Sequence, residues 1–320
     1  MSKCVYTAPD DSRCEEPAEE SSKFCFWHNP DAQKNDPEIK TQLEDKARNN
    51  ISLCGYQLQK ANLENAYFIE ANLTQADLTR ANLENGHLFG IDLRSTNLLK
   101  ANLTNANLKE ANLENADLLG ANLLNADLER VHWGPGNRVI NHHEANALAS
   151  RGDKDGASEK YLGAEEVYRS IRKCYDAAGT ADVAGEFFYN EMVAKRKQMP
   201  KWSIPRIWSW LVEMLCGYGE IPYRIIGSSI TYILFNAFIY IFFGMHHGDQ
   251  IHAFDKDVPL FDNITTLGYA IYFSIVTFTT LGYGDFSPVG WAKPFAAIEA
   301  FIGAFMIALF ILAFVKKMTR

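Results

Sequence analysis

The chain has 320 residues, a net charge of −8 and a mean hydropathy of −0.19. These averages exclude a chain embedded throughout in a membrane and belong to a largely water-soluble chain, and they would hide a small membrane part. No grouping of nucleophile, base and metal ligand typical of a catalytic site occurs, so we do not expect an enzyme.

The first 50 residues contain a group of possible metal ligands, Cys4, Cys14, Cys25 and His28. The segment 4–28 has little apolar material, and a tetrahedral zinc ion would supply the core that it lacks. The Cys25-x-x-His28 spacing is typical of metal ligands, whereas the longer gaps are less diagnostic. Reduced cysteines in a disordered tail are the alternative, and the cytoplasmic placement argued below disfavours disulfides. The other three cysteines are expected to be ordinary thiols: Cys54, Cys174 and Cys216.

Residues 51–135 repeat with a period of five. Leucine is the third residue of every pentad except two, which have Phe68 and Trp133. A period of five returns to no common face of a helix and alternates sides on a strand. A backbone that turns a corner every five residues keeps each central leucine, and the small residue two positions before it, inside. The segment resembles the pentapeptide-repeat family, which implies a right-handed quadrilateral β-helix.

The number of pentads in one coil follows from the asparagines. With four pentads per coil, Asn residues stack in two columns and form ladders: Asn62, Asn82, Asn102 and Asn122, and Asn65, Asn85, Asn105 and Asn125. A leucine-rich repeat has a similar period but uneven leucine spacing. Some pentapeptide proteins mimic DNA through a long acidic face, which basic residues interrupt here, and we expect no nucleic-acid partner. Leu99 and Leu119 point outward on one face with Leu124 nearby, either as a docking patch or as scattered surface leucines.

Residues 136–200 are expected to form a helical hairpin with a turn at Gly179-Thr180. The first helix places Ala164, Val167, Tyr168, Ile171, Cys174 and Tyr175 on one face. The hairpin weakly resembles one tetratricopeptide unit, which implies a subunit contact or a partner groove; packing against the repeats is an equal alternative. His142 and His143 are expected at the surface.

Residues 201–223 predict an amphipathic helix at the inner membrane surface. Apolar residues recur at helical spacing through residue 215, while Trp202 and Trp210 accompany the basic Lys201 and Arg206. A basic, Trp-rich amphipathic helix before a membrane span is typical of an interfacial segment.

Residues 224–320 predict a membrane domain. The uncharged runs 225–245 and 295–315 are each long enough to cross the roughly 30 Å hydrocarbon core, and Pro294 suits the first turn of the second. Residues 267–278 are apolar but too short to cross, and Asp262 and Asn263 are possible N-caps. This pattern predicts a re-entrant helix between two spans.

The loop after that helix is Thr280-Leu281-Gly282-Tyr283-Gly284-Asp285. Main-chain carbonyls can replace the water around a dehydrated potassium ion, and the two glycines permit the backbone angles that such a cage needs. The loop resembles the filter of potassium channels, with Leu281 in place of the usual Val or Ile. The resemblance implies that Tyr283 braces the loop, that Tyr272 and Phe273 form an aromatic cuff, and that Val276 removes a glutamate restraint on Asp285. It also implies that segment 201–215 is a slide helix.

Basic residues flank both spans on one side: Lys195, Arg196, Lys197, Lys201, Arg206, Arg224, Lys316, Lys317 and Arg320. The intervening loop is acidic at Asp249, Asp255, Asp257 and Asp262, so both termini are expected in the cytoplasm of a plasma-membrane protein. One filter strand cannot surround an ion, and the family resemblance implies a homotetramer.

Control of conduction is expected from upstream, through an unknown cytosolic ligand or partner and the helix at 201–215. Gly303 in the second span is a candidate gating hinge. Glu299, an intramembrane carboxylate, either hydrogen-bonds behind the filter and confers pH sensitivity or faces a water-filled vestibule.

The sequence therefore predicts a multidomain protein: a zinc module, a β-helix, a helical hairpin and an all-α pore domain. The expected function is passive, potassium-selective conduction through a tetrameric pore, with K⁺ in the filter. A membrane-tethered pentapeptide scaffold with little conduction is the alternative.

Overall fold

The computed structural model describes residues 2–20, 22–34, 36–248 and 250–318. Asp249 and Arg320 of the predicted charge pattern lie outside these residues. The chain divides into two compact units, Met1–Arg206 and Ile207–Arg320. The division falls inside helix α5 (Ile204–Cys216), within the segment predicted to link the cytosolic and membrane parts.

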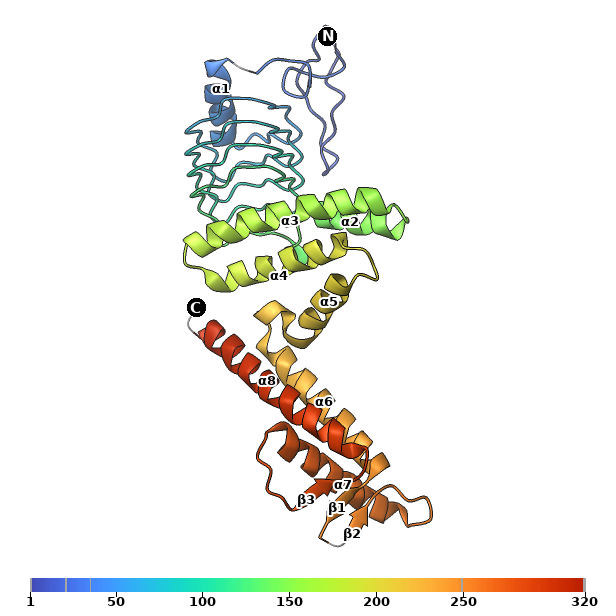
Figure 1. The fold of residues 1–320 in the computed structure, drawn as a ribbon. Helices are drawn as coiled ribbons and strands as arrows, with labels where there is room; N and C mark the ends of the chain where they lie inside the picture. The colour runs from blue at the N-terminus through green and yellow to red at the C-terminus, as the bar shows by residue number, and fades with distance from the viewer. Residues whose placement is uncertain (1, 21, 35, 249, 319–320) are drawn as a thin grey trace. The chain divides into compact units, whose positions relative to one another are not determined.

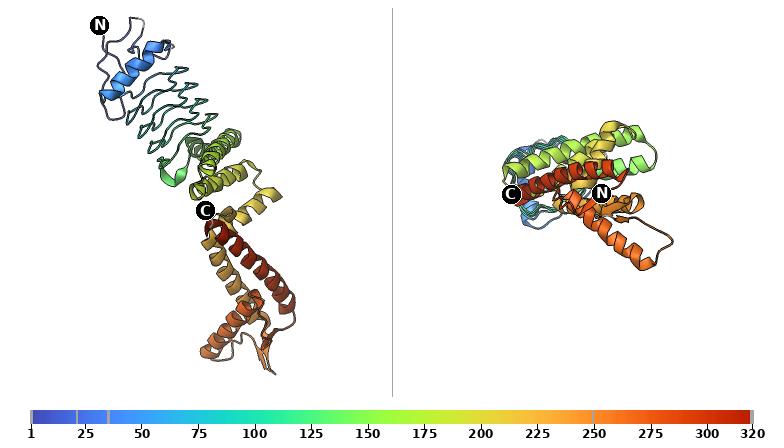
Figure 2. Two further views of the ribbon diagram at one scale, coloured as in Figure 1. Left: turned by 90° about the vertical axis from the view of Figure 1, so that its left-hand side faces the viewer. Right: turned by 60° about the horizontal axis from the view of Figure 1, so that its bottom comes forward.

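The repeats form a stack of coils with a period of 20 residues (Figure 1; the left view of Figure 2 shows the stack from the side). Parallel bridges join residues twenty apart, from Gln57 with Asp77 to Asn112 with His132. The corner residue that ends most pentads has positive φ, for example 56° at Asn65 and 68° at Gly120. The central leucines are buried in a continuous core. Four pentads per coil are thus confirmed.

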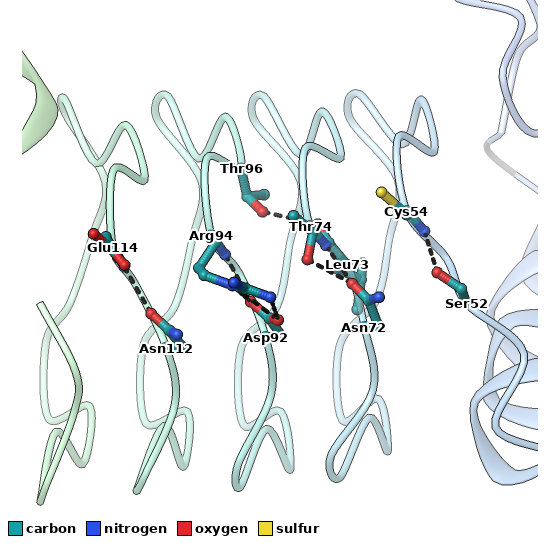
Figure 3. A network of polar contacts seen from close by, with 10 residues as sticks. All are labelled: Ser52, Cys54, Asn72, Leu73, Thr74, Asp92, Arg94, Thr96, Asn112 and Glu114. Atoms are coloured by element: carbon teal, nitrogen blue, oxygen red, sulfur yellow. Dashed lines mark hydrogen bonds and ion pairs between the residues drawn. The ribbon is translucent and has the colours of Figure 1, made fainter. Parts of the chain in front are cut away.

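Asn and Asp side chains at the second position of a pentad close its corner. In Figure 3 the backbone amides of Thr74, Arg94 and Glu114 donate to the side chains of Asn72, Asp92 and Asn112, at 3.0–3.1 Å. This local bond explains the preference for Asn and Asp there.

The expected asparagine ladders form between neighbouring coils. Asn82 donates to Asn62 at 3.1 Å and Asn102 to Asn82 at 3.0 Å. The second ladder links Asn85, Asn105 and Asn125, whereas Asn65, expected in the same column, donates to Glu64 instead. Asn122 departs from the expectation, because its amide donates to the Thr104 hydroxyl rather than to Asn102.

The first coil is covered by residues that sequence patterns did not assign to any element. Helix α1 (Pro37–Arg48) is capped by Asp36 and buries Ile39, Leu43 and Ala47. Gln57 N–H donates to the carbonyl of Trp27 at 2.8 Å, as Asp77 N–H donates to Tyr56 one coil further on. The Trp27 carbonyl therefore replaces a preceding coil and satisfies an edge donor that would otherwise be open.

The last coil is covered by three helices: α2 (Ile140–Ser150), α3 (Lys154–Ala177) and α4 (Ala181–Gln198), which follow the 3-10 turn η1 (Pro135–Asn137). The predicted hairpin is α3–α4, and α2 is an additional helix. Tyr175 Oη donates to the Leu128 carbonyl at 3.0 Å, so α3 packs directly on the repeats. The prediction of a surface position for His142 was wrong: it is buried under Tyr161 and Tyr168 of α3, whereas His143 is exposed.

The second unit contains two long apolar helices, α6 (Pro222–Phe243) and α8 (Ala292–Met318), that run side by side (Figure 1). Among the described residues these two are long and apolar enough to cross a membrane. The first was expected to reach Met245, but Gly244 at φ 88° ends the helix and Met245 belongs to a strand. The short turn η2 (Gly217–Gly219) precedes α6.

Between them in the sequence lie α7 (Leu260–Phe278) and a three-stranded antiparallel sheet in the order β2-β1-β3, so the prediction of an all-α domain was wrong. The strands are β1 (Met245–His247), β2 (Gln250–His252) and β3 (Phe286–Pro288). α7 begins seven residues before the predicted start at 267, after Pro259. Asp262 and Asn263 therefore lie inside its first turn and do not cap it; Asn263 instead bonds the backbone of Asp255.

Candidate functional site

The loop that follows α7 has alternating backbone angles. φ is 56° at Thr280, 56° at Gly282 and 80° at Gly284, whereas Leu281 and Tyr283 are not in the positive region. Backbones that alternate in this way point successive amides to one side and successive carbonyls to the other. The backbone N–H groups of Thr279, Thr280 and Leu281 donate hydrogen bonds to carbonyls in the last turn of α7, and these bonds hold the start of the loop. This alternation of φ is what a row of carbonyl oxygens for a dehydrated cation needs, and the row itself stays a prediction.

A hydrogen bond from α7 holds the far end of this loop. Tyr272 Oη donates to Asp285 Oδ2 at 2.9 Å, and the neighbouring Phe273 is buried behind it against Tyr240. Val276 is buried and apolar. Tyr283 is 68 % exposed in the single chain, so its expected bracing role stays a prediction.

His247 is a contact of the loop that sequence reasoning missed. Its Nδ1 lies 3.1 Å from the Asp285 carbonyl oxygen, and its ring stacks on Phe286 with 4.4 Å between centroids. Because a carbonyl only accepts, Nδ1 carries the proton. Only the pairing of β1 with β3 brings His247 to Asp285, which is 38 positions away. No local signal pointed to it.

Two residues of α8 contact α7 behind the loop. Glu299 is fully buried and lies 2.5 Å from both Tyr240 Oη and Ser274 Oγ, which excludes the exposed-vestibule alternative for this residue in the single chain. Four residues further on, a Cβ at Gly303 would lie 2.1 Å from the carbonyl oxygen of Phe278, the last residue of α7. The absence of a side chain at 303 therefore permits a close helix–helix approach.

The N-terminal ligand atoms converge as predicted. The four ligand atoms of Cys4, Cys14, Cys25 and His28 lie within 4.8 Å of one another. His28 Nδ1 is 3.2 Å from Cys25 Sγ and 3.6 Å from Cys4 Sγ, and Cys14 Sγ is 3.8 Å from Cys25 Sγ. In a tetrahedral zinc site with Zn–S of about 2.3 Å and Zn–N of about 2.0 Å, neighbouring ligand atoms are about 3.5–3.8 Å apart, which is close to the distances given above.

Contacts outside this cluster orient its histidine. His28 Nε2 lies 3.0 Å from the carbonyl oxygen of Cys54, and the ring stacks on Tyr6 at 3.9 Å. A proton on Nε2 leaves the Nδ1 lone pair facing the sulfurs, as metal-bound histidines require. Cys54 was expected to be an ordinary thiol away from this cluster, but its backbone carbonyl contacts His28 and its Sγ lies 3.2 Å from Tyr6 Oη. Burial raises the pKa of the Cys25 thiol to about 12, so ionisation calls for a compensating cation.

Exposed aromatic side chains cluster around α5. Trp202 is 89 % exposed, and Trp208, Trp210, Ile204 and Ile207 are also exposed. This distribution agrees with an interfacial helix. On the repeats, Leu119 packs against Gly163 of α3, which agrees with the docking patch proposed for the outward leucines. Leu124 is exposed.

Comparisons with known proteins divide the chain in the same way. Residues 228–320 match the family described as Ion channel, and residues 57–94 and 96–132 match Pentapeptide repeats, in 8 copies. No curated protein matches the chain.

Three of the solved structures that match are pentapeptide repeat proteins. One from the cyanobacterium Cyanothece 51142 is 34 % identical over 28 % of this chain and 59 % of its own, with a TM-score of 0.19. HetL, involved in heterocyst differentiation regulation in Nostoc sp. strain PCC 7120, is 32 % identical over 23 % and 37 %, with a TM-score of 0.15. One from the Arabidopsis thaliana thylakoid lumen is 20 % identical over 29 % and 74 %, with a TM-score of 0.15. This chain thus covers well under two thirds of the first two.

Proposed function

We propose that this chain, in which an ion channel domain follows a run of pentapeptide repeats, is a potassium-selective channel. The observation that carries the proposal is the alternating φ of residues 280–284, because it aligns uncharged oxygens for a dehydrated ion. The bond from Tyr272 to Asp285 supports it by tying the loop to α7, the proposed re-entrant pore helix. Conduction is passive, and no catalytic step is involved.

Four chains form the pore in this proposal. A single loop presents carbonyls on one side of an ion only, and closed cyclic symmetry supplies the other three sides. The broad exposure of α6 and α8 in the single chain, with Phe238, Phe301 and Phe305 more than 60 % exposed, supports burial by lipid or by neighbouring copies. Both termini lie in the cytoplasm in this proposal, at the plasma membrane, and the basic residues before α6 and after α8 support that topology.

The repeats, in the proposed right-handed quadrilateral β-helix, form the cytosolic part together with the helical hairpin. A zinc ion held by Cys4, Cys14, Cys25 and His28 stabilises the N-terminal segment; the donor set and the distances between ligand atoms support it. A cytosolic ligand or partner acts on this part.

The test is potassium flux into liposomes that contain the purified full-length protein. We expect uptake of K⁺ and exclusion of Na⁺. Gly282→Ala places a side chain at a φ of 56° in the loop and should abolish the flux, whereas Gly227→Ala in α6, with open space around its Cβ, should not. Absence of flux in a reconstituted, assembled wild type would favour the alternative, a membrane-tethered scaffold.

A further inference from the structure

The buried Glu299 joins three helices through hydrogen bonds. Glu299 Oε2 lies 2.5 Å from Tyr240 Oη of α6, and Oε1 lies 2.5 Å from Ser274 Oγ of α7. Ser274 Oγ also lies 2.8 Å from the backbone carbonyl of Ile233 in α6. Three contacts therefore connect four groups in the interior of the second unit.

Counting hydrogen atoms decides the protonation state. A carbonyl oxygen only accepts, so the contact with Ile233 uses the single hydroxyl hydrogen of Ser274. The contact between Ser274 and Glu299 then needs a hydrogen from Glu299 itself. That proton is now used, and the contact with Tyr240 takes the phenol hydrogen. Three contacts are satisfied by three donors only if the carboxyl group is protonated.

The surroundings of Glu299 agree with an uncharged acid. The groups that face it are Tyr240 and Tyr232 of α6 and Ser274 of α7. Within the described part of the chain no Lys or Arg forms an ion pair with it. An ionised carboxylate would be buried without a counter-charge and would compete with Ile233 for one hydrogen, which is costly.

We infer that Glu299 is a positioning residue of the conduction pathway, which acts as a neutral acid that donates to Ser274. This inference rests on the proposed channel function. Ser274 and Phe278 of α7 face Glu299 and Gly303 of α8, so two contacts, four residues apart on each helix, hold the end of α7 from which the loop starts. The proton thus maintains the contact through which α8 fixes the position of Thr279 and Thr280. Ionisation at alkaline pH breaks one bond of the network and lowers conduction.

Two substitutions distinguish whether Glu299 acts as a neutral hydrogen-bonding group or as a charged carboxylate. In Glu299→Gln the amide donates to Ser274 and its carbonyl accepts from Tyr240, so the network persists without a titrating group. We expect wild-type K⁺ selectivity and open probability in planar bilayers, now independent of pH on the alkaline side, where the wild type declines. Glu299→Leu removes both bonds and should lower open probability by about tenfold or more, the effect of an unpaired buried hydroxyl. A Gln variant that assembles but is as impaired as the Leu variant would overturn the inference.

Infrared spectroscopy tests the protonation state of Glu299 without a measurement of potassium conduction. A carbonyl band of a protonated carboxylic acid should be present in the full-length wild type at neutral pH and missing in Glu299→Gln. If the difference spectrum shows a carboxylate instead, the inference is wrong. This readout separates the two proposals: a wild type that conducts no potassium but retains the acid band contradicts the channel function alone.

Discussion

At the scale of single residues, the tightest constraint is at Gly303. It was predicted as a hinge because glycine in a pore-lining helix permits bending, and that role stays a prediction. The structure shows a second reason for glycine, because the backbone of α8 approaches the Phe278 carbonyl too closely for any side chain. Both roles can be separated by a residue that keeps the helix straight but adds volume.

Gly303→Ala should displace the end of α7. A methyl group 2.1 Å from the Phe278 oxygen forces one helix to move, and overpacking of this kind destabilises by about 1–3 kcal/mol. We expect a lower dissociation temperature of the assembly in detergent and reduced K⁺ flux. Gly268→Ala in α7, whose Cβ meets no atom within 4 Å, is the matched control. Unchanged stability and flux in Gly303→Ala would mean that the close contact does not form.

We expect His142 to make the first unit sensitive to acid. Tyr168 Oη accepts from Val139 N–H and can donate to His142 Nδ1 at 2.9 Å, which requires a neutral ring. Burial is the main cause that lowers the pKa of His142 from 6.5 to about 3. Because the unfolded state takes up the proton first, stability is full above pH 6.5 and falls as the pH decreases towards 3, by about 1.4 kcal/mol per unit.

Proteolytic resistance of the full-length protein checks this dependence. Between pH 6.5 and 5 the free energy of unfolding should fall by about 2 kcal/mol. This fall should disappear in His142→Asn, which keeps an acceptor near the Nδ1 position. The exposed neighbour His143→Asn should retain the wild-type profile. An identical pH profile for wild type and His142→Asn would show that His142 does not titrate as described.

At the scale of elements, the N-terminal module and the first coil depend on each other. The loop from Cys25 to His28 contains Trp27, whose carbonyl accepts from Gln57 in the first coil, and His28 reaches the Cys54 carbonyl. A metal ion that fixes this loop therefore also caps the open end of the stack, as terminal repeats must be capped.

Metal removal should loosen this end first. We expect one zinc ion per chain by elemental analysis, and chelation or Cys25→Ser should increase amide hydrogen exchange in residues 53–65 while the central coils stay protected. Cys174→Ser is the matched control, because a serine hydroxyl can still donate to the Leu123 carbonyl as Cys174 Sγ does. Unchanged exchange after complete chelation would show that the segment needs no metal.

At the scale of the whole molecule, the proposed control by the first unit has to act through residues before the first span, whereas Gly303 and Glu299 lie in the second span. α5 precedes α6 in the chain, and within the second unit Lys316 at the end of α8 forms an ion pair with Glu220, just before α6. Movement of the α5–α6 connection can therefore reach α8 without passing through the loop at 280–284. The proposal that the cytosolic part gates the channel is testable by removing that part.

A chain that starts at Lys201 should still assemble and conduct potassium. Its open probability should no longer respond to whichever condition regulates the full-length channel, tested in bilayers across pH, calcium, nucleotides and membrane potential. If full-length and truncated channels respond identically to every condition, the repeats and the hairpin serve as a scaffold only.

The sequence by itself determined the elements whose physics is local. A period of five with leucine at its centre specifies corners, and stacking at 20 residues follows from repeated asparagines. The two apolar runs specify spans because hydrocarbon thickness sets their length. The loop at 280–284 and the four candidate metal ligands were found from their residue types, together with the close Cys25-x-x-His28 spacing and the two glycines of the loop.

The tertiary structure alone decided the contacts between distant residues. Glu299 was visible as an intramembrane acid, but its partners Tyr240 and Ser274 are 59 and 25 positions away, and no local pattern pairs them. The same holds for His247 with Asp285 and for the burial of His142 under α3. The chemistry of a polar side chain defines which hydrogen bonds it can make. Packing decides which groups come within reach and, for Glu299, whether the carboxyl group keeps its proton.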